Sequence, residues 1–442
     1  MKLVRTVAVL GVLGVTGCPG PDVDNNTASS SGGGGSSGGG GGSSAQASSS
    51  APSSSGGGGS STAGSTAGSS SGGGASSAPS GSSSGGCALD ELGPADRDRV
   101  VVLSHTFGPM AGEPGHWVRS LTLPVTGALV DDGVRVDVGV KVRRFLFMPS
   151  GAVVLALGED GEVISLAVDA VDQITEVDRV LLPSADYSDL VLGEGRRVYA
   201  VGLNVGDTSG LSTVVVACDG RLTHDTAAFF NIRLAESLVL LPGKRAVLLG
   251  GQASFAPVDV FDTRLLTVGD TGFSEVAALD LWSDVVNTGR IGVSPLGDLL
   301  VVPNSSIFSN EGGLTRVFKM EGTMMTQTQQ LSLASAQEVL WSPDGTTVLL
   351  SRDESNRVAV YTRTGDTLTF SAELTGIGLA TQMAMVTRGA AAGRILVPSV
   401  DPNGGPNVAM LRLTGPGTVA NEGQVELGSG NEHIPDAVAI AP

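Results

Sequence analysis

The chain has few of the side chains from which catalytic and metal sites are most often built. Its 442 residues include three cysteines and four histidines, and aromatic residues make up 4%. The sequence contains no C-x-x-C, no H-E-x-x-H and no phosphate-binding glycine loop. These absences exclude zinc fingers, zincin-type metalloproteases and P-loop nucleotide hydrolases, and they predict a protein without a cofactor.

Positive charge is also scarce. Lys and Arg number 26 against 44 Asp and Glu, which gives a formal net charge of −18. The few charges before residue 25 cancel, so the whole excess belongs to the part of the chain after residue 88. Nucleic acids and anionic lipid headgroups bind positive patches, so we expect neither as a direct partner of that part.

The sequence has only one apolar leader, and it is short. Lys2 and Arg5 precede about a dozen mostly apolar residues that end at Val15. A membrane-spanning helix needs roughly 20 such residues. A basic start, a short apolar core and small residues at its end predict a cleaved export signal over residues 1–17.

The end of this leader, Val15-Thr16-Gly17-Cys18, resembles the lipobox of bacterial lipoproteins. The resemblance implies that Cys18 is the lipid-attachment residue and the membrane anchor. Pro19 follows where an aspartate would imply retention in the inner membrane, so we expect the outer membrane, on its periplasmic side or at the cell surface. The alternative is an ordinary secreted protein that is cut near Gly17.

Residues 18–87 form a low-complexity segment. Ser and Gly occupy 46 of the 58 positions in residues 29–86, and no charged residue occurs from Asn25 to Leu89. Such a segment has too little apolar surface to offset the entropy of ordering it. We therefore expect a disordered tether between the anchor and a folded domain.

Residues 88–442 consist mainly of short Val/Leu/Ile runs bounded by Gly, Pro, Asp and Asn, which predicts many short strands. A unit of two apolar strands around a tight turn recurs, and a third strand usually follows. The turn glycines are Gly151, Gly195, Gly243, Gly297, Gly345 and Gly393, spaced by 44, 48, 54, 48 and 48 residues. A period near 48 with four strands per unit is typical of β-propeller blades.

A seventh blade is split between the chain ends. "PDAVAIAP" at the end has the pattern of an innermost strand, while "RVVVLSHT" and "HWVRSLTLP" near the start supply the second and third strands. Joining them closes the ring and removes exposed sheet edges. We predict an all-β fold, a seven-bladed β-propeller of four-stranded antiparallel blades over residues 88–442. Because residues 125–143 and the 54-residue interval are ambiguous, six or eight blades and a two-sheet sandwich are the alternatives.

One blade carries a family resemblance. Ser342-Pro343-Asp344-Gly345 followed by Asn356-Arg357-Val358-Ala359-Val360-Tyr361 resembles the YVTN and lactonase-like group of bacterial propellers. The motif is structural, so it supports the fold and says little about function. A lactonase-like site would require Glu, Arg and His around the central channel, and Arg352 and Asp353 are the candidates for such a position.

Two small constellations remain. Cys87 and Cys218 are the other cysteines, and an exported chain often pairs such thiols, so a disulfide is the prediction and two free thiols the alternative. His105, His116 and His433, with Glu113 and Glu432, fall in connections that reach one face of the closing blade. They could bind a metal or ligand there, although scattered surface histidines are the simpler interpretation.

The sequence favours a recognition module over an enzyme. The longest polar, glycine-rich loops fall on one propeller face, where we expect a protein or glycan partner. The alternative function is a lactonase-like or metal-dependent hydrolase of the cell envelope. We expect a monomer that contacts the membrane only through its lipid.

Overall fold

A computed structural model describes the chain from residue 86 onward, with gaps. The described residues are 86–107, 115–168, 173–183, 186–203, 209–232, 234–250, 262–281, 289–304, 314–333, 336–352, 357–377, 382–401, 405–427 and 433–442. The predicted signal, Cys18 and the tether to residue 85 lie outside them. Among the described residues, no helix is long and apolar enough to cross a membrane.

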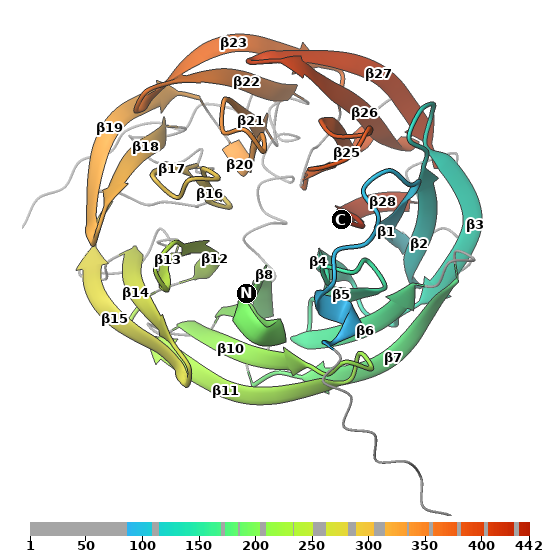
Figure 1. Cartoon of the computed structure of the whole chain (residues 1–442), viewed down its shortest axis with the longest axis horizontal. Coiled ribbons are helices and arrows are strands. Elements are labelled where there is room, and N and C mark those ends of the chain that lie inside the picture. The colour runs from blue at the N-terminus through green and yellow to red at the C-terminus, as the bar shows by residue number, and fades with distance from the viewer. Residues whose placement is uncertain are drawn as a thin grey trace, which may run out of the picture. The chain divides into compact units, whose positions relative to one another are not determined.

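Seven four-stranded antiparallel sheets form a closed ring, which confirms the predicted propeller (Figure 1). Six sheets are made of strands consecutive in sequence. From the innermost strand outward, these six blades are β4 Val142–Phe147, β5 Val153–Gly158, β6 Glu162–Val168, β7 Ile174–Leu181; β8 Asp186–Leu192, β9 Arg197–Leu203, β10 Ser209–Val216, β11 Leu222–Phe230; β12 Ala235–Leu241, β13 Arg245–Gly250, β14 Thr263–Gly269, β15 Gly272–Leu279; β16 Gly292–Val293, β17 Leu299–Val302, β18 Leu314–Glu321, β19 Met324–Ser332; β20 Ala336–Trp341, β21 Thr347–Arg352, β22 Arg357–Thr364, β23 Thr367–Thr375; and β24 Ala384–Met385, β25 Arg394–Asp401, β26 Gly405–Gly415, β27 Thr418–Glu426.

The remaining blade joins the two ends of the chain, as predicted. Its order is β28-β1-β2-β3, with bounds His433–Ile440, Arg99–Phe107, His116–Leu123 and Val130–Asp137. The ambiguous residues 125–143 therefore contain the fourth strand of this blade and the start of the next. The blades are numbered 1 for this closing blade and 2 to 7 along the chain.

Alternation along the second strands explains how the blades pack. In β5, Val154 and Ala156 contact the core shared with blade 1, while Leu155 and Leu157 contact the core shared with blade 3. Both faces of an inner strand are thus buried, which gives a continuous apolar run. Between its two buried end residues, the outermost strand β11 alternates between half-buried and exposed residues.

The repeated glycine turns join the first and second strands. The glycines at positions 151, 195, 243, 297, 345 and 393 all have φ between +62° and +85°. This backbone region is costly for residues with a Cβ atom, which accounts for the recurring glycine.

A segment that we call the N-terminal strap, residues 87–98, crosses blades 3, 2 and 7 before β1 begins. Cys87 forms a disulfide with Cys218 beyond β10. Asp90, in the short 3-10 helix Ala88–Asp90, pairs with Arg196 at 2.7 Å. The Ser150 N–H donates to the Leu89 carbonyl at 3.2 Å, and the Ala390 N–H donates to Asp96 Oδ1 at 2.8 Å.

Candidate functional site: a charged ring in the channel

In each blade, one residue within or just before the innermost strand occupies an equivalent position. The position is found by counting back from the turn between the first and second strands. At this turn, a residue at the end of the first strand donates its N–H to the second strand, as Met148 does to Val153 O and Ser342 to Thr347 O. The equivalent residue lies four positions before that donor. In blade 4, the pairing of Leu241 with Arg245 sets the same position. We call these residues the channel ring: Arg144, Asp189, Ser237, Arg290, Glu338, Gln382 and Ala437.

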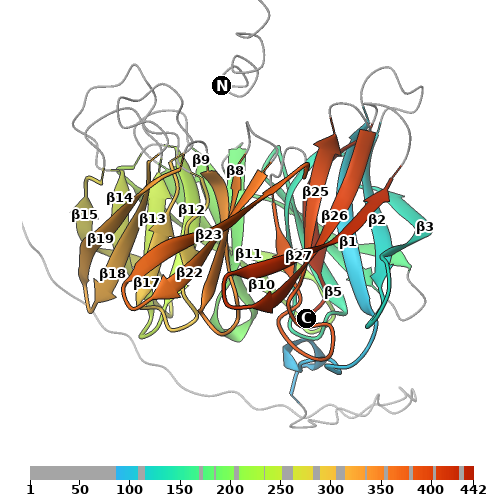
Figure 2. The ribbon, with the colours of Figure 1, turned by 90° about the horizontal axis from the view of Figure 1, so that it is seen from above.

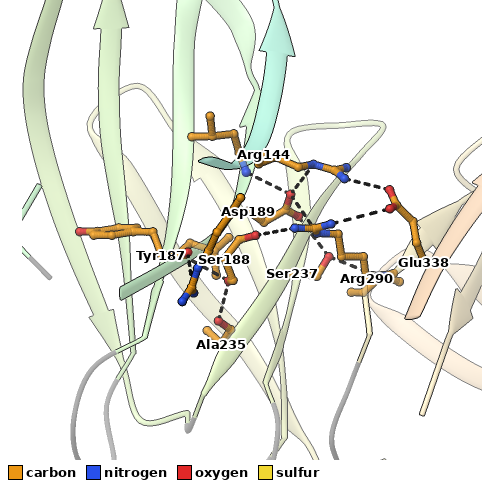
Figure 3. Close-up of polar contacts among 12 residues, drawn as sticks. Arg144, Tyr187, Ser188, Asp189, Ala235, Ser237, Arg290 and Glu338 are labelled. Atoms are coloured by element: carbon orange, nitrogen blue, oxygen red, sulfur yellow. Dashed lines mark hydrogen bonds and ion pairs between the residues drawn. The ribbon is translucent and has the colours of Figure 1, made fainter. Parts of the chain in front are cut away.

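Four members of the channel ring meet through charged contacts (Figure 3). Arg144 Nε lies 3.2 Å from Asp189 Oδ1, and its Nη1 lies 2.8 Å from Glu338 Oε1. Because Arg144 belongs to blade 2 and Glu338 to blade 6, this pair joins blades that are not neighbours in the ring. Arg290 of blade 5 lies 3.8 Å from Asp189 Oδ1 and 3.7 Å from Glu338 Oε2.

Uncharged donors fix the two carboxylates. Asp189 accepts hydrogen bonds from the Leu190 N–H at 3.0 Å and from the Ser237 hydroxyl at 3.3 Å. Glu338 Oε2 accepts the Met383 N–H at 3.2 Å. Each acid is therefore held by its own blade or the next one as well as by an arginine.

Backbone carbonyls near the ring are also used. Arg290 Nη2 donates to Ser188 O at 2.9 Å, and the Ser188 hydroxyl donates to Ala235 O at 3.0 Å. These bonds link blades 3, 4 and 5 at the same level as the charged contacts, as Figure 3 shows. The channel ring is thus part of the joint between blades as well as a polar surface.

The four charged side chains of the channel ring are largely shielded from solvent, which strengthens the interactions between them. The side chains of Asp189 and Glu338 are each 5% exposed, whereas those of Arg144 and Arg290 are 20% and 19% exposed. Burial alone would lower the pKa of the Arg144 guanidinium, but Glu338 and Asp189 outweigh it and hold that pKa above its ordinary value. The two guanidinium groups are therefore more exposed than the two carboxylates.

The chemistry available here is that of paired arginines and acids. Guanidinium groups donate to carbonyl, carboxylate or phosphate oxygens in a planar, bidentate manner. A carboxylate can accept a proton from water in a general-base step. Among the described residues, no three His, Cys, Asp or Glu side chains converge as metal ligands.

The residues predicted from sequence lie elsewhere. The backbone register places His105, His116 and His433 at the same end of blade 1: Thr106 pairs with His116 and Phe107 with His433. The side chains of His105 and His433, and residues Glu113 and Glu432, lie outside what the structure describes. The histidine site therefore remains a prediction.

The structure describes the lactonase-like candidates of the sequence only in part. Arg352 ends β21, the second strand of blade 6, and pairs with Ala336 at the start of β20. Asp353 lies outside the described residues. Among the described residues of blade 6, the acid in the channel ring is Glu338, on the innermost strand.

A signal for the channel ring was present in the sequence. Arg144, Arg290 and Glu338 are charged residues within or just before apolar innermost strands, each seven residues before its turn glycine. Asp189 and Ser237 lie six residues before theirs, and Gln382 lies eleven before, because the turns differ in length. Only the strand register shows that these positions are equivalent.

The propeller is similar to several solved structures. A candidate 6-phosphogluconolactonase from Bacteroides uniformis aligns with a TM-score of 0.61 at 15% identity, over 78% of this chain and 99% of that one. The periplasmic gluconolactonase of Pseudomonas aeruginosa aligns with a TM-score of 0.60 at 14% identity, over 78% and 99%. A hypothetical selenium-binding protein from Sulfolobus tokodaii gives 0.60 at 10% identity, over 80% and 97%.

No protein-family profile and no curated protein sequence matches this chain. At 10–15% identity, the structural similarity establishes the seven-bladed fold alone. Function has to be argued from the site.

Proposed function

We propose that this protein is a lactonase-like hydrolase that opens a sugar lactone at the channel ring. The observation that carries the proposal is the convergence of Arg144, Asp189, Arg290 and Glu338 from four blades within the channel. Two of the similar structures bear gluconolactonase names, which supports the substrate class. This replaces the recognition module that the sequence favoured as the leading hypothesis.

Lactone opening needs a group that activates water and a group that stabilises negative charge. In the proposed step, Glu338 accepts a proton from water as the hydroxide oxygen bonds to the lactone carbonyl carbon. The guanidinium groups of Arg144 and Arg290 donate to the carbonyl oxygen as it becomes an oxyanion. The ring C–O bond then breaks, and the leaving alkoxide takes the proton back from Glu338 to give a hydroxy acid, which ionises to the carboxylate.

Glu338 is the better candidate for the base than Asp189. Asp189 accepts from Arg144, from its own neighbour Leu190 and from Ser237, so its oxygens are committed to fixing the ring. Glu338 has a longer side chain and, among the described residues, accepts one hydrogen bond from an uncharged donor, the Met383 N–H. It can therefore turn toward a bound water when a substrate oxygen draws Arg144 away.

The test is hydrolysis of glucono-1,5-lactone by the full-length protein, followed by acid release at constant pH. Glu338→Gln keeps the shape and should lower kcat about 10²- to 10⁴-fold. Glu422→Gln is the matched control, since Glu422 pairs with the buried Arg394 at 2.8 Å in blade 7, on its outermost strand. Loss of activity in both variants, or in neither, would contradict the proposal.

Recognition without catalysis is the second candidate. The carboxylates of Asp189 and Glu338 already contact arginine. Such pairing is expected if the channel ring binds a ligand without catalysis, or if it only joins the blades. The predicted contact surface, the long-loop face, includes residues 251–261 and 305–313, which the structure does not describe. A thermal-shift screen with Ca²⁺, Zn²⁺, sugars and cell-wall fragments separates the two candidates, because stabilisation without turnover supports recognition.

We further propose that the propeller is exported and held at the outer membrane by lipid on Cys18. The resemblance of residues 15–18 to a lipobox supports this. Cys18→Ala should move the protein from the membrane fraction to the soluble fraction, and mass spectrometry of the N-terminal peptide should show acyl chains only in the parent. If Cys18 carries no lipid, the proposal of a lipid anchor is wrong, and residues 1–17 would be the signal of an ordinary secreted protein.

A further inference from the structure

A second polar site lies along the same channel, near the first-to-second-strand turns. A cavity of about 280 Å³ is lined by β4, by residues 382–388 around β24 and by residues 438–442 at the end of β28. These are the innermost segments of blades 2, 7 and 1, and Figure 1 shows the C-terminus inside the ring beside them. The volume is close to the lower limit of ~300 Å³ for small-molecule pockets.

Two arginines enter this cavity, and we call it the arginine pocket. Arg99, which begins β1, is 1% exposed. Its Nη2 donates to Ala95 O at 2.7 Å and to Arg388 O at 3.3 Å. Its Nε and Nη1 are buried, and so are Nε and Nη2 of Arg388; within the described residues none of these four nitrogens has a hydrogen-bond partner.

Nearby acids do not balance these charges. Burial, then Arg388 and Arg97, lower the pKa of Arg99, and within the described chain the acid that raises it is Asp96. Asp96 lies on the strap and accepts the Ala390 N–H. An arginine stays charged in a protein, so an anion from outside would satisfy the buried donors of Arg99 and of the half-buried Arg388.

The rest of the wall is largely apolar. Phe145 and Phe147 of β4 and Met383 and Val386 of the blade 7 segment are each less than a tenth exposed and line the cavity. A fully hydrated inorganic ion would leave this surface without a partner. A ligand with an acidic head and a compact apolar body matches both parts of the wall.

We propose that the arginine pocket binds a small organic anion, its carboxylate or phosphate group on Arg99 and Arg388 and its apolar body against the phenylalanine and methionine side chains. Parallel N–H donors of guanidinium groups suit the paired oxygens of either acid. Gln382 of the channel ring also lines the pocket, but the anion-binding groups differ from those of the proposed lactone site, because Arg99 and Arg388 lie at the turn end of their blades. Occupation of the pocket does not require that the protein be a lactonase.

The strap makes this site sensitive to the chain end that precedes the propeller. The Ala95 carbonyl on the strap holds Arg99, and the Arg388 carbonyl holds it from blade 7. Arg99 therefore joins blades 1 and 7 to the strap, and a bound anion would add a fourth component to this junction. We expect ligand binding to protect the strap and the closing blade together.

Isothermal titration of the full-length protein tests the proposal, with benzoate, phenyl phosphate and inorganic phosphate as the probes. The organic acids should bind with Kd below about 1 mM and more tightly than inorganic phosphate. The preferred head group then separates a carboxylate source from a phosphate-ester source. Arg99→Gln and Arg388→Gln should each weaken binding at least tenfold.

Arg363→Gln is the matched control, because Arg363 pairs with Asp298 outside the pocket and its loss should leave the affinity unchanged. If Arg99→Gln does not fold, Arg388→Gln, at a half-buried position, still decides the test. Absence of binding by all three probes to the parent, or unaltered affinity in folded Arg388→Gln, would overturn the proposal. Equal affinity for inorganic phosphate and phenyl phosphate would overturn the part assigned to the apolar wall.

Discussion

The two ends of the central channel hold the same kind of side chain in opposite states. At the channel ring, two arginines face two carboxylates and the formal charges cancel. In the arginine pocket, two arginines share a cavity, and four of their buried nitrogens find no partner in the described chain. The comparison teaches that burial alone does not assign a role to an arginine. An arginine whose nitrogens contact carboxylates forms a structural pair, whereas one whose buried nitrogens have no acceptor is a candidate for binding an anion.

The largest expected effect is on the paired end. Arg144→Met should lower the free energy of unfolding by about 3 kcal/mol, because it leaves two carboxylates that are 5% exposed with only the more distant Arg290. Chemical denaturation of the full-length protein measures this. Arg357→Met removes a pair with Glu373 in which the arginine is 44% exposed, and should cost less than about 1 kcal/mol. If both variants lose a similar free energy of unfolding, the contacts of Arg144 in the channel ring contribute no more to stability than an exposed ion pair.

A double-mutant cycle sharpens the same point. Arg144→Met and Glu338→Gln should couple by about 2 kcal/mol, since the two side chains are in direct contact at 2.8 Å. Additive losses would mean that each residue acts through its own blade rather than through the contact across the channel.

At the unpaired end, the effect on stability should be smaller. Arg99→Met removes a desolvated charge but also leaves the Ala95 and Arg388 carbonyls without their donor, so the two effects offset. We expect a change of about 1 kcal/mol or less in anion-free buffer. Added benzoate should raise the melting temperature of the parent and leave that of Arg99→Met unchanged. If Arg99→Met lowers the free energy of unfolding as much as Arg144→Met does, the two ends of the channel do not differ in how their arginines contribute to stability.

The smallest effect concerns an arginine–acid pair outside the channel. Arg363 Nη2 lies 2.6 Å from Asp298 Oδ2, and this contact lowers the pKa of Asp298. A depressed folded-state pKa stabilises the protein above the unfolded value of about 3.9, and the stabilisation is lost as pH falls through the lower folded value. Because Asp298 is 36% exposed, we expect less than about 1 kcal/mol.

The measurement is the difference in melting temperature between the parent and Asp298→Asn. It should be present at pH 7, shrink as pH falls below the unfolded value of about 3.9, and vanish once pH is below the lower folded value, where the carboxyl is protonated in both folded and unfolded chains. A difference that persists unchanged in acid would show that the residue acts through its shape rather than its charge.

The sequence was sufficient for the fold because the fold repeats. Six turn glycines near a common spacing marked six blades, and the apolar run at residues 435–442 supplied the missing innermost strand. The channel ring was not predicted, since each member is a single polar residue in a different blade and its distance to the turn glycine varies. The arginine pocket was also missed: Arg99 and Arg388 are 289 positions apart, and only ring closure brings them together.

The strap gives the propeller a defined path for mechanical load. Any tension on residues before Cys87 divides between the disulfide to blade 3 and the backbone that continues to β1. Without the disulfide, the full pull would act on β1, which pairs with β28 to complete the closing blade. The covalent bond shields that seam, so reduction of Cys87–Cys218 should lower the force at which the propeller opens far more than it alters the unloaded fold.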